Sequence, residues 1–160
     1  MPRRRSVDFI RDIGVDPRYQ SFLVQKMINY IMERGKKNVA RHIVYEAIDI
    51  LTKKSKGDEK KGYELFEKAI IKIKPAVEVK ARRVGGSVYQ IPTEVRATRA
   101  LALSLRWIIQ SAAARSDKTM GQRLASEMFD AVEGRGNAFK KKTDVHRMAE
   151  SNRAFSHYAW

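Results

Sequence analysis

The side chains best suited to chemistry in this chain are basic ones that crowd next to two glycines. Lys80, Arg82 and Arg83 come just before Gly85 and Gly86, and we expect all five at the tip of a turn. A guanidinium presents a planar fork that grips phosphate and stacks on bases, and glycine lets a phosphate backbone approach closely. Like charges on a short turn repel one another unless an anion neutralises them. This pattern favours contact with a nucleic acid over its alternative, a solvated strand edge whose charge blocks strand pairing.

Three more arginines follow on the next predicted helix. Arg96 and Arg99 are three residues apart, and Arg106 lies seven beyond Arg99, so one helical face would present them as a row. Other basic clusters have simpler alternatives, since a short basic tail can merely solubilise and lysines near a helix end can merely complement its dipole. The remaining candidates for nucleic-acid contact are Arg3, Arg4, Arg5, Arg11, Lys36, Lys37, Lys118, Lys140, Lys141, Lys142 and Arg147.

Two features near the C-terminal end also indicate contact with a partner molecule. Residues 140–142 are three lysines that open a predicted helix, where positive charge opposes the dipole. This conflict indicates that something outside the fold accounts for them. Phe155, Tyr158 and Trp160 could stack on bases or cover a protein neighbour, and Phe155 could equally pack on the domain's own core.

The sequence holds no constellation typical of catalysis or metal binding. His42, His146 and His157 are not paired at the four-residue spacing of a helical metal site, and the chain has no cysteine. The glycine pair at 85–86 lacks the Lys-Ser or Lys-Thr of a phosphate-binding loop, and no nucleophile elbow occurs. We therefore expect no enzyme activity, no cofactor and no metal.

The balance of charge predicts a polyanionic partner. Thirty-three Lys and Arg face eighteen Asp and Glu, a net charge of +15. The first 80 residues carry +8 and the last 80 carry +7, so the excess covers the whole body. A nucleic acid would relieve the self-repulsion and release counterions. Two rivals stay open: a DNA architectural protein with a basic β-arm, and a protein-interaction module whose charge only confers solubility.

Apolar periodicity predicts a mainly α fold. Residues 1–18 read as a basic N-terminal arm, and within 19–160 apolar residues recur at three and four positions in about six segments. At about 75–92 the period changes to two residues, which indicates a β-hairpin. We expect a single domain of about six helices with one protruding hairpin inserted between helices three and four.

Local signals predict where the helices begin and end. The first should begin near Tyr19, Thr93 should cap the fourth, residues 116–117 (Ser-Asp) should cap the fifth, and the sixth should span about 138–152. No stretch of about 18 apolar residues and no signal-peptide core occurs. We therefore expect a cytoplasmic protein without a membrane span.

Six motifs resemble one family along nearly the full chain. They read DPRY at 16–19, IMERGKK at 31–37, RRVGGSVYQIP at 82–92, RW at 106–107, DKTM at 117–120 and HRMAESNRAF at 146–155. In order and spacing they resemble the bacterial-type small-subunit ribosomal protein number seven, the universal uS7 family. The resemblance implies a helical body with a β-hairpin. It also implies a structural constituent of the small ribosomal subunit that binds the 3′ major domain of its rRNA and nucleates assembly of the head.

The resemblance also implies roles for particular residues. The hairpin would lie near the exit-tRNA site and the mRNA path, so Lys80, Arg82, Arg83, Gly85 and Gly86 would lie close to tRNA or mRNA. The three basic residues among them would touch rRNA as well. The other basic candidates would bind rRNA. Neighbouring head and platform ribosomal proteins are further implied partners, and the free protein is expected to be a monomer.

Overall fold

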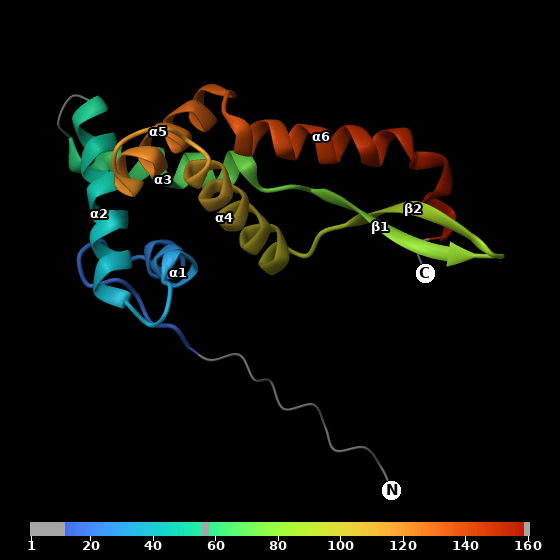
Figure 1. Cartoon of the computed structure of the whole chain (residues 1–160), viewed down its shortest axis with the longest axis horizontal. Helices are drawn as coiled ribbons and strands as arrows, with labels where there is room; N and C mark the ends of the chain where they lie inside the picture. Colours follow the sequence, from blue (N-terminus) through green and yellow to red (C-terminus); the bar gives the residue numbers. More distant parts are fainter. Residues whose placement is uncertain (1–11, 56–57, 159–160) are drawn as a thin grey trace, which may run out of the picture.

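The computed structural model describes residues 12–55 and 58–158. Within these ranges six α-helices are present, and a two-stranded antiparallel sheet lies between the third and the fourth, which confirms the predicted fold (Figure 1). The elements are α1 (Phe22–Ile31), α2 (Lys37–Lys54), α3 (Glu59–Ile73), β1 (Val77–Val84), β2 (Ser87–Glu94), α4 (Ala97–Ala113), α5 (Met120–Glu133), α6 (Asn137–Ser151) and the 3-10 helix η1 (Arg153–Tyr158).

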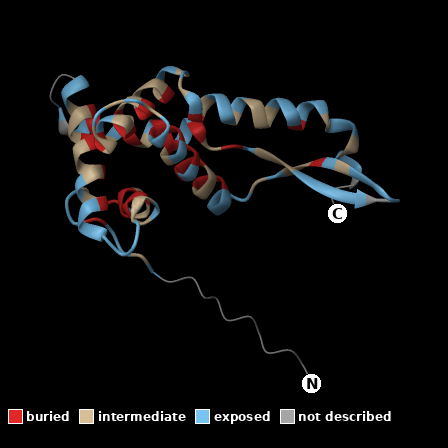
Figure 2. Ribbon diagram, in the orientation of Figure 1, coloured by how far each residue is buried: buried red, intermediate tan, exposed pale blue. Residues whose placement is uncertain are grey.

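One apolar core holds α1 to α5 together. Each of these helices carries apolar residues three or four positions apart, so each has one face to bury. Every one of the five contributes a fully buried side chain, for example Met27, Ile48, Phe66, Leu105 and Leu124. Figure 2 shows the buried positions gathered in this helical body, whereas the hairpin is mostly exposed. The core therefore fixes the helices and leaves the hairpin outside.

A buried carboxylate ties the chain before α1 to α2. Asp16 accepts the Tyr45 hydroxyl at 2.7 Å and the backbone N–H groups of Arg18 and Tyr19 at 3.1 Å. Burial, and then this hydrogen bond, raise the pKa of Tyr45 to about 12. The last residues before α1 are thus fixed on the body.

Two helices begin later than predicted. α1 begins three residues after Tyr19, because the Ser21 side chain accepts two backbone N–H groups of the first turn. α5 is capped by Thr119 in a capping box with Gln122. Residues 116–117 do not cap it, and the Asp117 side chain instead accepts a hydrogen bond from the arginine two positions before it. α6 begins and ends within one residue of its prediction.

β1 and β2 form a regular hairpin that extends past its predicted end. Residues 77–84 pair with 87–94 in reverse order, and residues 85–86 make the turn. The prediction that Thr93 caps α4 is wrong, because Thr93 pairs with Glu78 in the ladder. α4 therefore begins four residues after Thr93.

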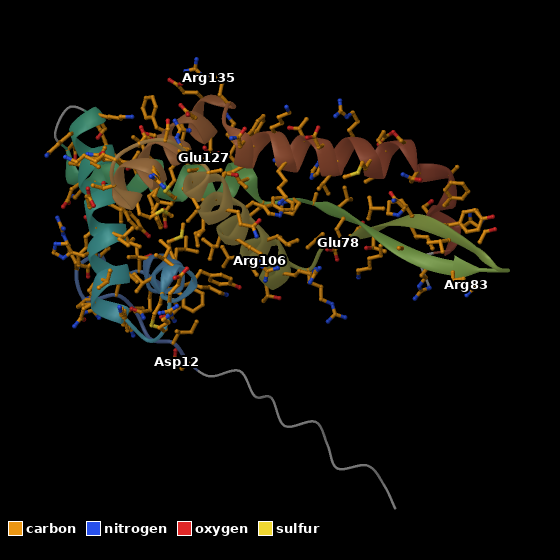
Figure 3. All side chains as sticks on the ribbon, in the orientation of Figure 1. Asp12, Glu78, Arg83, Arg106, Glu127 and Arg135 are labelled. Carbon is orange, nitrogen blue, oxygen red and sulfur yellow. The ribbon has the colours of Figure 1, made fainter. Side chains whose placement is uncertain are left out.

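A fully buried carboxylate joins α5 to the elements on either side of it. Glu127 accepts a hydrogen bond from Arg115, just after α4, at 2.9 Å and from the backbone N–H of Ala138, at the start of α6, at 2.8 Å. Arg115 also binds Asp130 at 2.8 Å. Gly136 leaves room for the carboxylate, since a Cβ there would lie 2.9 Å from Glu127 Oε1. The starting point of α6 therefore depends on Glu127 (Figure 3).

Removing the guanidinium that pairs with this carboxylate should destabilise the protein strongly. Arg115→Ala leaves Glu127 buried without its cation, so we expect the free energy of unfolding in a urea titration to fall by about 3 kcal/mol. The matched control is Arg106→Ala, because Arg106 is an exposed arginine on α4. This substitution should change the free energy of unfolding by less than about 0.5 kcal/mol. Equal losses for the two variants would contradict the role given to Glu127.

Candidate nucleic-acid interface

The turn of the hairpin is open to the backbone of a partner. Gly85 and Gly86 have φ angles of 57° and 93°, in the left-handed region that favours glycine, and a Cβ on either would meet nothing within 4 Å. Arg82 and Arg83 lie at the end of β1 beside this turn. Lys80 does not lie at the tip as predicted, because the strand continues past it and places it in the middle of the ladder.

The two faces of the hairpin differ because alternate residues of a strand point to opposite sides. On one side Ile91 is 1% exposed and Tyr89 is half-buried, with its ring centroid 5.1 Å from that of Phe155 in η1. On the other side Arg83 and Val88 form an exposed cross-strand pair. The side of Tyr89 and Ile91 is termed the covered face, and the side of Arg83 and Val88 the open face.

Glu78 binds two of the predicted contact residues within the protein. Its two carboxylate oxygens accept Arg99 Nε at 2.9 Å, and Lys80 Nζ lies 3.5 Å away. The carboxylate is only 12% exposed. Because Arg99 belongs to α4, this ion pair ties the base of β1, where Figure 3 labels Glu78, to the helical body. Arg99 and Lys80 are thus partly neutralised before any partner arrives.

Arg96 and Arg106 keep their charges available. Both are exposed, and neither forms an ion pair with a carboxylate of the described residues. The prediction that Arg96 lies on α4 is wrong, because Arg96 precedes the helix as its N-cap residue. The predicted row of three is therefore interrupted, since its first residue lies before α4 and Arg99 turns to Glu78.

Two of the three lysines that open α6 have partners inside the fold. Lys142 donates to the backbone carbonyl of Lys72 at 2.7 Å, and Lys141 donates to the side chain of Gln110 at 3.3 Å. The prediction that a partner outside the fold accounts for residues 140–142 is therefore wrong for Lys141 and Lys142. Lys140 is exposed and makes no ion pair within the part of the chain that the structure describes.

The other predicted contact residues lie on separate elements. Lys36 and Lys37 are at the start of α2 and Lys118 precedes α5, all three exposed, while Arg147 of α6 pairs with Asp144 at 2.6 Å. The hairpin tip lies far from α2, at the other end of the molecule (Figure 1). The candidates thus form several basic regions instead of one cluster. Those outside the described residues are Arg3, Arg4, Arg5 and Arg11.

Two contacts that hold the hairpin were not predicted. His146 Nε2 accepts the backbone N–H of Ala76 at 3.2 Å, just before β1. Burial, and then the charge of Lys142, lower the pKa of His146, which favours the neutral ring that accepts this bond. Phe155 packs on Tyr89 of the hairpin. The aromatic composition of the C-terminal end was the only signal in the sequence for either contact.

Residues 12–55 and 58–158 show neither a membrane-spanning helix nor a metal-binding cluster. None of the helices there is long and apolar enough to cross a bilayer. No three His, Asp or Glu side chains in these ranges gather where they could hold a metal ion.

One family profile covers almost the whole chain. The family described as "Ribosomal protein S7p/S5e" matches residues 2–153. The chain belongs to this family. Membership confirms the resemblance seen in the six sequence motifs, and it identifies a ribosomal protein and not an enzyme.

Relatives in several bacteria carry the name small ribosomal subunit protein uS7. The protein of Blochmanniella floridana is 54% identical over 157 residues, which are 98% of this chain and 99% of the relative. That of Colwellia psychrerythraea is 53% identical over 160 residues, which are the full length of both. That of Hahella chejuensis is 54% identical over 158 residues, 99% of each.

Lowering the pH should loosen the base of the hairpin. A protonated His146 cannot accept the Ala76 N–H, and its pKa lies below the ordinary 6.5, so the bond is fully present above pH 6.5 and is lost as the pH falls through the lowered pKa. We expect the hydrogen-exchange protection factor of the Ala76 amide to fall between about pH 7.5 and pH 5. His146→Leu should make that factor low and independent of pH, whereas His42→Leu should leave the decrease intact. A protection factor that does not change with pH in the unmodified protein would refute this role.

Proposed function

We propose that this chain is a structural, non-enzymatic constituent of the small ribosomal subunit. We further propose that it is a primary binder of the 3′ major domain of the subunit's rRNA and nucleates assembly of the head. Family membership supports the place of the chain in the small ribosomal subunit. The proposal of rRNA binding rests on one observation: Arg83, Arg96 and Arg106 are exposed and form no ion pair with a described carboxylate. Free guanidinium groups of this kind are suited to phosphate.

The mechanism that fits this arrangement is structural. Exposed basic residues lie on α2, at one end of the molecule, and on the hairpin, at the other end (Figure 1), so they can hold separate RNA helices at a junction. The body then selects one arrangement of the RNA from its ensemble. Shape and phosphate geometry should dominate recognition, because the major groove of A-form RNA is too narrow for side chains to read.

The open face of the hairpin is the side available to tRNA or mRNA. Phe155 occupies the covered face, whereas Arg83 and Val88 are exposed on the open one. From the family resemblance, the hairpin is proposed to lie near the exit-tRNA site and the mRNA path, with its open face toward them. Further proposed partners are neighbouring head and platform ribosomal proteins on cytoplasmic ribosomes, and the free chain is proposed to be a monomer. The proposed rRNA contacts include the basic arm at 1–18.

The first test compares RNA with DNA across a salt series. We expect the protein to bind the 3′ major domain of small-subunit rRNA at least tenfold more tightly than a duplex DNA of equal length at moderate salt. The affinity for RNA should fall steeply between about 50 and 200 mM salt, because phosphate contacts release counterions. Equal affinity for the two polymers would favour the DNA architectural protein, which also joins a helical base to a basic arm.

A second test removes one charge at a time. Arg83→Ala removes a cation of the open face that pairs with no carboxylate in the described part of the chain, so the slope of log affinity against log salt should become shallower by about one. Arg135→Ala removes the same charge from the α5–α6 turn, where Glu133 already pairs with it, and should leave the slope unchanged. Equal changes for both variants would mean that net charge alone drives binding.

A further inference from the structure

The body fixes the direction of α6 before the helix reaches the hairpin. Glu127 binds the N–H of Ala138 at 2.8 Å at the start of α6, and one turn later Lys142 donates to the Lys72 carbonyl of α3 at 2.7 Å. From there α6 runs along the hairpin and contacts both β1 and β2 (Figure 1). The first turns of α6 are therefore fixed to the helical body by contacts that do not involve the hairpin.

The end of the chain returns to the hairpin. η1 packs on β2, and the rings of Phe155 and Tyr89 lie 5.1 Å apart with a tilt of 46°. Ile91, on the same face as Tyr89, is 1% exposed, and Ala149 in the last turn of α6 is 5% exposed. Neither belongs to the main helical core. A second, small apolar zone therefore lies where the hairpin meets the C-terminal segment.

Phe155 supports the hairpin close to its arginines. A two-stranded hairpin has little stability of its own in water. Its base is held by Glu78 with Arg99 and by the bond between Ala76 and His146, but both contacts lie next to the body. Tyr89, in contrast, pairs with Arg82 in the ladder. The Phe155 contact thus lies near the tip, on the opposite side from the open face.

We propose that α6 and η1 form a strut that fixes the direction of the hairpin, with Phe155 as the positioning residue through which the strut acts on Arg82 and Arg83. The link from this direction to RNA binding rests on the proposed function. A segment that is fixed before binding loses less conformational entropy when it meets its partner. Phe155 therefore raises the affinity for RNA without touching the RNA.

The strut is tested first in the free protein. Phe155→Ala should lower the hydrogen-exchange protection of β1 and β2 amides roughly tenfold, the upper end of what is expected for losing an aromatic pair, and should leave amides in α2 and α3 unchanged. Phe155→Tyr should restore the protection, because the ring is kept. Phe22→Ala makes the same change at an exposed phenylalanine of α1 and should leave the hairpin amides unaffected.

The same contact is approached from the hairpin side with Tyr89→Leu, which should lower the same protection factors. This second variant keeps the test decisive if Phe155→Ala proves difficult to fold. Hairpin amides that keep their protection in both variants, or that lose it only together with α2 and α3, would overturn the strut.

The link to RNA is tested with a double-mutant cycle on the 3′ major domain of rRNA. Made alone, Arg83→Ala should weaken binding. In a Phe155→Ala background the same change should have a smaller effect, because the arginine is no longer held in place. Strictly additive effects would show that Phe155 does not act through the hairpin. If the unmodified protein fails to prefer this RNA, the proposed function fails, and the exchange data alone decide the strut.

Discussion

The buried carboxylate of Glu127 is the interaction on which the arrangement of the molecule depends. It joins Arg115, two residues after the end of α4, to its own helix and to the first turn of α6. An ionised carboxylate removed from water is costly unless a cation and hydrogen-bond donors surround it. Loss of either partner would therefore destabilise the junction of the three elements. Since α6 begins at this point and leads to η1, the position of the hairpin also depends on the ion pair between Glu127 and Arg115.

The same ion pair shapes the surface charge. Arg115 forms ion pairs with Asp117, Glu127 and Asp130. Three of the eighteen acidic side chains therefore pair with one of the thirty-three basic ones. Fewer carboxylates remain to neutralise the exterior. Gathering three carboxylates around one arginine leaves the rest of the surface more positive than an even spread of ion pairs would. A fold with this internal pairing gains more from a polyanionic neighbour than one whose ion pairs are spread evenly.

Periodicity was enough to predict the helices and the hairpin, because each element satisfies its own hydrogen bonds and shows its buried face in nearby residues. Long-range competition could not be predicted in this way. Thr93 has the chemistry of a helix cap, yet pairing with Glu78 prevails. Arg99 looks like a free cation in sequence, but its partner lies 21 residues away, and Ala76 and His146 are 70 residues apart. The basic residues were visible from the start, whereas their division into paired and unpaired groups needed the tertiary structure.

The two-residue turn at 85–86 also limits how the hairpin can change in length. Side chains alternate between faces, so one additional residue in each strand would rotate the tip by half a turn relative to the base. Arg83 would then face η1, and the ring of Tyr89 would face solvent. Two additional residues in each strand would restore the faces and carry the tip about 7 Å further out. Insertions compatible with this architecture therefore come in units of four residues.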